Sequence, residues 1–250
     1  RLSFKAKGSG KSGLIATSRP GQEVLSRTAC EIGRNEITAR FEVGFPAFGR
    51  TINSGELIRI FFDFLPGCVE NVFFYRRQNN AEIKKRITLA DDQQFIRNEL
   101  KRLDLVSFVA DGSILPRETG VSDRPMKGSV AFHSPDSLRI TLNLPGHGPI
   151  SGMAIHRGIT LIVGGGYHGT STLLKALESG VYNHIPGDGR EYVITDETAV
   201  KLRAEDGRSI NHVDISLFIR DLPNKKDTTC FSTADASGST SQAAAVIESI

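Results

Sequence analysis

The stretch Ile-Thr-Leu-Ile-Val-Gly-Gly-Gly-Tyr-His-Gly-Thr-Ser-Thr-Leu-Leu-Lys-Ala-Leu, residues 159–177, decides the fold of this chain. Its first five residues form a short apolar run rich in β-branched side chains, which predicts a buried strand over 159–163. Glycines at 164–166 break that strand, and Ser171 and Thr172 open a helix whose leucines recur at helical spacing. Glycines let main-chain N–H groups approach a ligand, and a helix N-terminus adds donors and partial positive charge. The stretch therefore predicts a phosphate-binding turn, the alternative being a strand–helix turn without a ligand.

The glycine turn matches most of the phosphate-loop pattern G-x-x-x-x-G-K-[ST]. Gly164, Gly169 and Ser171 fit the pattern, but Thr170 stands where the pattern has lysine. In a working loop that lysine neutralises the β- and γ-phosphates, and the hydroxyl after it holds Mg²⁺. The prediction is therefore a nucleoside triphosphate site with Mg²⁺ on Ser171 but with weakened charge neutralisation.

Composition sets the class of protein. The chain has 250 residues, 39% of them hydrophobic and 24% charged, and a net charge of +3. These values fit a globular protein of one large or two small domains, and the mild basicity is far below that of a nucleic-acid-binding arm. No apolar stretch is long enough to span a membrane. The odd cysteines, Cys30, Cys68 and Cys230, lack metal-ligand spacing and predict reduced thiols in an intracellular protein, cytoplasmic or alternatively mitochondrial.

The first half alternates between strand and helix patterns. The patterns predict strands within 22–48, a helix from Ser54 that ends by Pro66-Gly67, a strand over 69–75, a helix over 91–103 and a strand over 106–109. A basic stretch, with Arg76, Arg77, Lys84, Lys85 and Arg86, fits a solvated face, and nucleic-acid contact is the alternative. Gly8-Ser9-Gly10-Lys11-Ser12 resembles the end of a phosphate loop, but only Arg1 to Phe4 precede it as a strand. Residues 7–13 therefore fit a flexible basic loop or a cloning remnant.

The second half contains the remaining candidates for chemistry. The patterns predict strands over 138–144, 150–155, 192–194 and 199–202, and a helix over 243–250 that Ser237-Gly238-Ser239 opens. Strand pairs just before a phosphate loop indicate an antiparallel subdomain beside a parallel core, with a domain boundary near residue 128. The loop over 111–128, which contains Arg117, either reaches a ligand or pairs with itself. His184 and Asp188 could serve chemistry, although two ligands do not make a metal site.

Several stretches taken together resemble a known family. They are Gly-Gly-Gly-Tyr-His-Gly-Thr-Ser-Thr at 164–172, Gly-Val-Tyr-Asn-His-Ile-Pro-Gly-Asp-Gly-Arg-Glu-Tyr at 180–192, Arg-Ala-Glu-Asp-Gly-Arg at 203–208, Ser-Thr-Ala-Asp-Ala-Ser-Gly-Ser-Thr-Ser-Gln at 232–242 and, in the first half, Lys-Gly-Ser-Gly-Lys-Ser-Gly-Leu at 7–14 and Phe-Val-Ala-Asp-Gly-Ser-Ile-Leu-Pro-Arg at 108–117. The chain resembles the predicted ATPases of the ABC class, a branch unrelated to transporters that includes bacterial proteins and a mitochondrial RNA-editing factor. The resemblance covers nearly the whole chain and assigns residues 7–13 to the family's N-terminal domain.

The resemblance implies an α/β fold, in which an ABC-type P-loop domain over 129–250 follows a smaller α+β N-terminal domain over 1–128. It implies that the Walker A loop, which binds ATP and Mg²⁺, consists of Gly164, Gly165, Gly166, Tyr167, His168, Gly169, Thr170, Ser171 and Thr172. It also implies an ABC signature that grips the γ-phosphate bound to the opposite subunit of a homodimer, formed by Ser237, Gly238, Ser239, Thr240, Ser241 and Gln242.

The sequence departs from the family pattern at several points. Thr170 replaces the Walker A lysine, no glutamine lies between Thr172 and Gln242, and no Walker B segment follows the signature helix. These departures fit a fragment, and hydrolysis is expected of the full-length protein rather than of this chain alone. The first hypothesis is an ATPase in which nucleotide binding and hydrolysis drive a conformational change of a head-to-tail dimer. The alternative is a nucleotide-responsive RNA-binding or scaffold protein that does not hydrolyse ATP.

Overall fold

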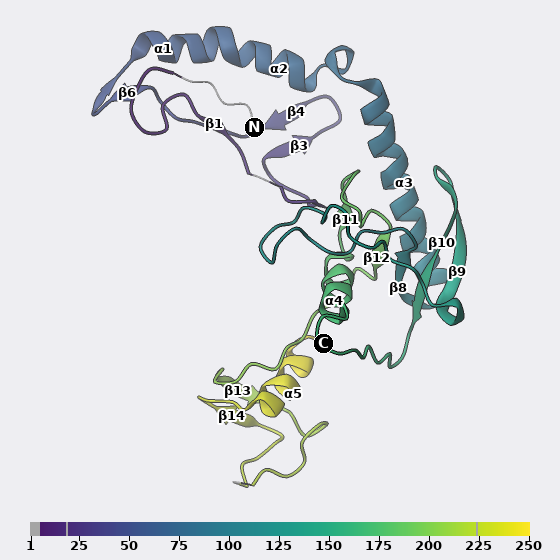
Figure 1. Ribbon diagram of the computed structural model, residues 1–250. Coiled ribbons are helices and arrows are strands. Elements are labelled where there is room, and N and C mark those ends of the chain that lie inside the picture. The colour runs from purple at the N-terminus through teal and green to yellow at the C-terminus, as the bar shows by residue number, and fades with distance from the viewer. Residues whose placement is uncertain (1–5, 19, 224) are drawn as a thin grey trace. The chain divides into compact units, whose positions relative to one another are not determined.

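Two compact units, Arg1–Glu197 and Thr198–Ile250, make up the chain (Figure 1). The computed structural model describes residues 6–18, 20–223 and 225–250. Helices and strands are mixed, as the α/β prediction requires. Among the residues described, no helix combines the length and the apolar character that crossing a bilayer demands.

A four-stranded antiparallel sheet is the centre of the first unit. Its strands, in spatial order, are β12 (Val193–Thr195), β8 (Leu105–Ala110), β10 (Gly148–His156) and β9 (Arg139–Leu144), as Figure 1 shows. The predicted strands over 106–109, 138–144, 150–155 and 192–194 are therefore confirmed. A short 3₁₀ turn, η3 (Asp136–Leu138), precedes β9. All strand pairings in the described part of the chain are antiparallel, so the antiparallel subdomain is present and the expected parallel core is not.

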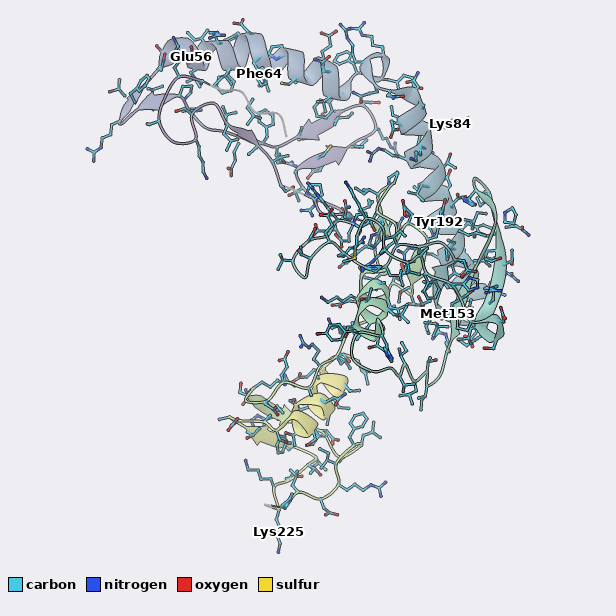
Figure 2. All side chains as sticks on the ribbon, in the orientation of Figure 1. Glu56, Phe64, Lys84, Met153, Tyr192 and Lys225 are labelled. Carbon is cyan, nitrogen blue, oxygen red and sulfur yellow. The ribbon has the colours of Figure 1, made fainter. Side chains whose placement is uncertain are left out.

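Two helices cover opposite faces of this sheet. Successive strand residues point to opposite faces, so Phe108 packs with the helix α3 (Asn80–Arg102), whereas Val109 packs with the helix α4 (Thr170–Ser179). Ile96 and Leu100 of α3 lie in the first apolar cluster. Ala176 of α4 lies in the second cluster together with Met153, which Figure 2 labels. The sheet therefore holds the helix that follows the glycine turn against its own core.

Short strands form the N-terminal region, as predicted for residues 22–48. They are β1 (Ile15–Ala16), β2 (Glu23–Val24), β3 (Cys30–Ile32), β4 (Ile37–Ala39), β5 (Glu42–Val43), β6 (Ala47–Phe48) and β7 (Thr51–Ile52). β1 pairs with β5, β3 with β4, β6 with β7, and β2 with β11 (Asn183–His184). The loop over 7–13 folds onto this region, because the Ser9 amide donates to the Ala47 carbonyl over 2.8 Å and the Gly13 amide to the Gly44 carbonyl over 2.6 Å.

The helix that begins at Ser54 continues beyond the predicted end at Pro66-Gly67. It runs through α1 (Ser54–Arg59), the π-helical turn η1 (Ile60–Phe64) and α2 (Leu65–Phe73), which the 3₁₀ turn η2 (Tyr75–Arg77) follows. Pro66 lies in the first turn of α2, just after the π-helical turn, so the helix continues through a proline that donates no backbone hydrogen bond. The strand predicted over 69–75 is therefore wrong, because its apolar residues continue a helix.

The helix predicted over 91–103 begins earlier, at Asn80. The Asn79 side chain caps it by accepting from the amides of Ala81 and Glu82 at 3.0 and 3.4 Å. Asp92 is consequently not a residue of the helix N-terminus but a buried residue of its middle. Its carboxylate accepts hydrogen bonds from the amides of Gly146 and His147 at 2.7 and 3.0 Å and thus joins α3 to the turn between β9 and β10.

The segment 159–163, predicted to be a buried strand, is irregular and exposed. β10 ends at His156, and the side chains of Ile159, Leu161 and Val163 are 104%, 82% and 76% exposed. A parallel strand is stable only with neighbours that satisfy its backbone and cover both of its faces. No strand of the part of the chain that the structure describes pairs with this segment, which explains why its β-branched composition does not produce a strand.

The second unit is a hairpin packed on a helix. β13 (Ile210–Val213) pairs with β14 (Phe231–Thr233), and α5 (Gly238–Glu248) covers them. Its core consists of Ile210, Ile215, Phe231, Ala236, Ala243 and Ala244. The predicted helix is present and begins at Gly238, whereas residues 199–202 form no strand. Val200 in that stretch is 65% exposed, so burial of its side chain contributes little to an extended conformation there.

Candidate functional site

The N-terminus of α4 leaves main-chain donors free behind the glycine turn. Gly169 is the residue that caps α4, and its φ of 85° lies in the left-handed region that favours glycine. The first intrahelical bond is donated by the Leu173 amide to the Gly169 carbonyl over 2.9 Å. The amides of residues 170–172 precede that bond, and glycine offers them no capping side chain. These donors and the helix dipole favour an anion at this position.

His168 closes the glycine turn from within. Its amide donates to the Gly165 carbonyl over 3.3 Å, and its ring Nδ1 accepts from the Gly165 amide over 2.9 Å. A Cβ at Gly164 would lie 2.7 Å from the Thr170 methyl carbon, so no larger residue fits there. Gly166, in contrast, has open space on the side where a Cβ would point. The turn therefore presents an open main-chain surface at Gly166 and a covered amide at Gly165.

The side chains of the turn supply hydroxyls but no charge at the helix start. Thr170 is the half-buried first residue of α4, Ser171 is exposed and Thr172 is half-buried. Tyr167 is fully exposed and has a φ of 66°. The main-chain donors and the Ser171 hydroxyl fit a nucleotide with Mg²⁺, whereas the missing lysine leaves the phosphate charge less neutralised. Among the described residues, no three His, Cys, Asp or Glu side chains gather to hold a metal ion.

Arg190, a candidate to replace the missing lysine, lies at the other end of α4. Its guanidinium donates to the Ser179 hydroxyl over 3.2 Å and, through Nε and a terminal nitrogen, to the Leu115 carbonyl. Ser179 is the last residue of α4, which is about 14 Å long at 1.5 Å per residue. Burial, followed by the charge of Arg117, lowers the pKa of Arg190 to about 10. This arginine therefore supports the helix rather than the phosphate loop.

A buried charged cluster holds the C-terminal end of α4. His184 Nδ1 lies 2.6 Å from Asp188 Oδ2, and His184 Nε2 lies 3.2 Å from the Ser179 carbonyl oxygen. Both ring nitrogens of His184 therefore face oxygens that accept hydrogen bonds. Arg117 also donates to the carboxylate and to the carbonyl of Asp188, each over 2.8 Å. Positive groups at this helix end are favourable to the helix dipole.

The charge on Asp188 is maintained against its burial. Burial raises the pKa of this carboxyl, but hydrogen bonds from His184 and Arg117 outweigh it and hold the pKa below its ordinary value. Sequence reasoning singled out His184 and Asp188, and the structure brings them together. It did not identify Arg117 and Ser179 as their partners, because no local spacing links residues that lie so far apart in the chain. Arg117 therefore pairs with a residue outside its own loop, which neither alternative for the loop over 111–128 anticipated.

The predicted signature stretch lies at the N-terminus of α5. Ser237 is its cap residue, and its hydroxyl lies 3.3 Å from that of Ser239 and 3.1 Å from that of Thr240. Thr240 and Ser241 are buried, and the Ser241 hydroxyl accepts from the Glu205 amide over 2.8 Å. Ser237, Ser239 and Gln242 are exposed, and Gly238 is half-buried. The side chains able to meet a ligand are therefore those of Ser237, Ser239 and Gln242.

Comparisons with known proteins match both parts of the chain. A family model for the P-loop domain of the ABC-class ATPases matches residues 79–250. A second model, described as the N-terminal part of an ATPase of the ABC class, matches residues 1–76. An uncharacterized protein of Methanocaldococcus jannaschii is 32% identical over 140 residues, which cover 53% of this chain and 31% of the relative. The chain thus spans less than a third of the length of this curated relative. The domain boundary near residue 128 stays a prediction.

Proposed function

Because this chain belongs to the ATPases of the ABC class, we propose that it binds ATP with Mg²⁺ through residues 164–172. The observation that carries this assignment is the uncapped N-terminus of α4 directly behind a glycine turn. In this proposal the amides of residues 165–172 hold the β-phosphate, apart from those of Gly165 and His168, which donate within the turn. The exposed Ser171 hydroxyl would hold Mg²⁺. Bound Mg²⁺ supplies neutralisation of the phosphate charge, which Thr170 cannot provide.

The same proposal extends to the whole protein. In it, two copies pair head to tail, and the exposed residues at the N-terminus of α5 meet the γ-phosphate bound to the partner. Nucleotide binding and hydrolysis in this dimer would drive a conformational change. The N-terminus of α5 supports this part of the proposal, because no side chain caps it and small hydroxyl residues surround it.

Calorimetry on Ser171→Ala tests the nucleotide site. Wild-type chain should bind ATP more tightly with Mg²⁺ than without it, because the hydroxyl completes the metal's coordination. The variant should lose most of this Mg²⁺ dependence. Ser249→Ala, which removes an exposed hydroxyl at the end of α5, is the matched control and should bind as the wild type does. Equal Mg²⁺ dependence in Ser171→Ala and wild type would exclude Ser171 as the ligand.

A second candidate function, RNA binding without hydrolysis, is favoured by one surface. Lys84, Lys85 and Arg86 are exposed on the part of α3 that precedes its first buried residue, Leu89, and Figure 2 labels Lys84 there. Exposed basic residues on one helix stretch can contact phosphates, and such binding weakens steeply with salt. ATP turnover measured with and without RNA separates the two functions. Turnover supports the ATPase, whereas salt-sensitive RNA binding without turnover supports the alternative.

A further inference from the structure

An open cleft lies in the N-terminal region and shares no residue with the predicted nucleotide loop. Its volume is about 730 Å³, and it lies beside the end of β1, the segment that precedes β3, and β5. This volume is within the range of small-molecule sites, roughly 300–1,000 Å³. The residues that line it include Thr17, Ser18, Ser26, Arg27, Thr28 and Phe41. The cleft is therefore large enough for a ligand of nucleotide size and much larger than a lone phosphate needs.

Two arginines line the cleft, and their hydrogen bonding differs. Arg40 is satisfied, because it donates to the Thr28 carbonyl over 2.7 Å and pairs with Glu31 at 2.8 Å. The Nε of Arg27 is buried and has no hydrogen-bond partner among the residues that the structure describes. A buried donor without an acceptor costs free energy. A bound ligand or ion that supplies the acceptor would remove that cost. Arg27 thus lines the cleft and keeps a donor without an acceptor among the described residues, which makes it the arginine of the cleft that is left to pair with an anion.

The remaining lining residues suit the rest of a nucleotide. Phe41 keeps 41% of its surface exposed, so its ring offers a face on which a base can stack. The hydroxyls of Ser18, Ser26 and Thr28 supply donors and acceptors suited to a ribose, and Glu42 supplies an acceptor for N–H groups. An anion alone would leave the aromatic ring and these hydroxyls unused.

We propose that this cleft binds a nucleoside monophosphate, with its phosphate on Arg27 and its base on Phe41. The site is separate from residues 164–172 and does not depend on the function proposed for them. Arginine is suited to this role because its planar guanidinium binds phosphate oxygens in pairs.

The absence of tryptophan from the sequence provides a local reporter. Phe41→Trp places a single indole in the cleft of the otherwise unchanged chain, and Phe48→Trp places one on an exposed residue outside it. Titration with adenosine monophosphate (AMP) should give a saturable change in the fluorescence of Phe41→Trp. The fluorescence of Phe48→Trp should not change. Ser171→Ala in the Phe41→Trp background should not alter the titration, which separates this cleft from the predicted nucleotide loop.

Variants of Arg27 then test the phosphate contact in the Phe41→Trp background. Arg27→Met keeps the apolar stem and should weaken AMP binding about tenfold or more, because a charged hydrogen bond is lost. Arg27→Lys keeps the charge and should weaken it less. Arg34→Met removes an exposed arginine outside the cleft and should change nothing. Adenosine, which lacks the phosphate, should bind more weakly than AMP by about the factor that Arg27→Met costs.

Several outcomes would overturn the assignment. These are no saturable response at millimolar AMP, equal titrations in Arg27→Met and the parent, or equal affinities for AMP and adenosine. If inorganic phosphate bound as tightly as AMP, the base and ribose contacts would be wrong. A response to an RNA oligonucleotide without one to AMP would assign the cleft to a macromolecule and would also overturn the proposal.

Discussion

Thr170 occupies the position where a phosphate loop carries its lysine, and the structure explains how a threonine fits there. Its methyl carbon faces Gly164, and its amide is one of the free donors of α4. The hydroxyl adds polarity without charge. Arg190, which could supply a positive charge, is bound to Ser179 at the other end of the helix. Lys175 is exposed and lies more than a turn into α4, about 7 Å along the axis from Thr170.

Thr170→Lys should therefore tighten ATP binding. One charged hydrogen bond contributes about 1.5–3 kcal/mol, which corresponds to about one to two orders of magnitude in affinity. Turnover in the full-length protein should rise as well, because charge neutralisation matters most in the transition state. Calorimetry with ATP and Mg²⁺ measures the first effect. Leu174→Lys adds the same charge on the exposed side of the same helix and should have a much smaller effect. Unchanged affinity in Thr170→Lys would mean that another cation already serves the loop.

Asp188 should make the stability of the chain depend on pH in the acid range. Its pKa in the folded chain is held below the ordinary value, near 3.8, so the ionised form stabilises the fold above that pH. This contribution is lost as the pH falls below 3.8 toward the folded pKa. Asp188→Asn should be less stable at neutral pH, by about 3 kcal/mol, because Arg117 is left buried without its charged partner. Urea denaturation from neutral to acid pH measures both effects.

The variant should also lose less stability than the wild type on acidification, because the titrating group is gone. Asp123→Asn is the matched control, since that carboxylate is exposed. It should follow the wild type at every pH. Parallel pH profiles for Asp188→Asn and wild type would show that the carboxylate of Asp188 contributes nothing to acid unfolding.

At the scale of elements, Asp92 links α3 to the hairpin of β9 and β10. Its carboxylate accepts from two main-chain amides and from the Tyr192 hydroxyl at 3.3 Å. Burial and the charge of Asp92 raise the pKa of Tyr192 to about 12, so this hydroxyl remains a donor at neutral pH. The helix and hairpin also approach closely, because a Cβ at Gly146 would lie only 2.1 Å from a Thr88 methyl carbon. The turn is thus fixed to the helix by polar contacts and by shape.

Asp92→Ala should cost about 1.5–3 kcal/mol of unfolding free energy, since it removes the charged acceptor of the Gly146 and His147 amides. Asp91→Ala removes an exposed carboxylate from the neighbouring position of the same helix and is the control. It should change the unfolding free energy by less than about 0.5 kcal/mol. Urea unfolding of the two variants makes the comparison. Equal stability of the two would mean that water satisfies the amides of Gly146 and His147 in the variant.

Elements with local determinants could be predicted from the sequence, and those that depend on distant partners could not. The helix after the glycine turn follows from Gly169, the spacing of its leucines and Gly180, all within one stretch. The continuation of α1 into α2 requires a π-helical turn, which no spacing of residues announces. The strand over 159–163 fails for the opposite reason. Its composition favours a strand, but no described strand lies beside it to supply hydrogen bonds.

At the scale of the whole molecule, the candidate site also has one part that local sequence determines and another that depends on distant residues. Main-chain donors at the start of α4 were predictable, because a glycine turn before a helix fixes them locally. The ring of His168 on the Gly165 amide and the pairing of Arg117 with Asp188 depend on side-chain geometry and on distant segments. Each unit has a buried core of its own. The core of the first unit holds α4, and the core of the second holds α5. In the head-to-tail dimer that we propose, the start of α4 in one subunit and the start of α5 in the other would meet one nucleotide.

That arrangement predicts dimers that depend on nucleotide. Sedimentation of the full-length protein should show more dimer with a slowly hydrolysed ATP analogue than without it, because the γ-phosphate joins the two subunits. Gly238→Asp should reduce this gain strongly. A Cβ at Gly238 would lie 3.1 Å from Asp206 Oδ1, so the variant adds a second carboxylate where the phosphate is expected. Two negative groups at this helix start would repel the phosphate of the partner.

The control variant for this experiment is Asn211→Asp, which adds the same charge to an exposed residue of β13 in the same unit. It should dimerise with nucleotide as the wild type does, since a general charge effect would act on both variants alike. If Gly238→Asp dimerised as readily as Asn211→Asp, the N-terminus of α5 would not face the nucleotide. If neither variant nor wild type responded to the analogue, the head-to-tail dimer itself would be wrong, while the calorimetry on Ser171→Ala would still test ATP binding by the single chain.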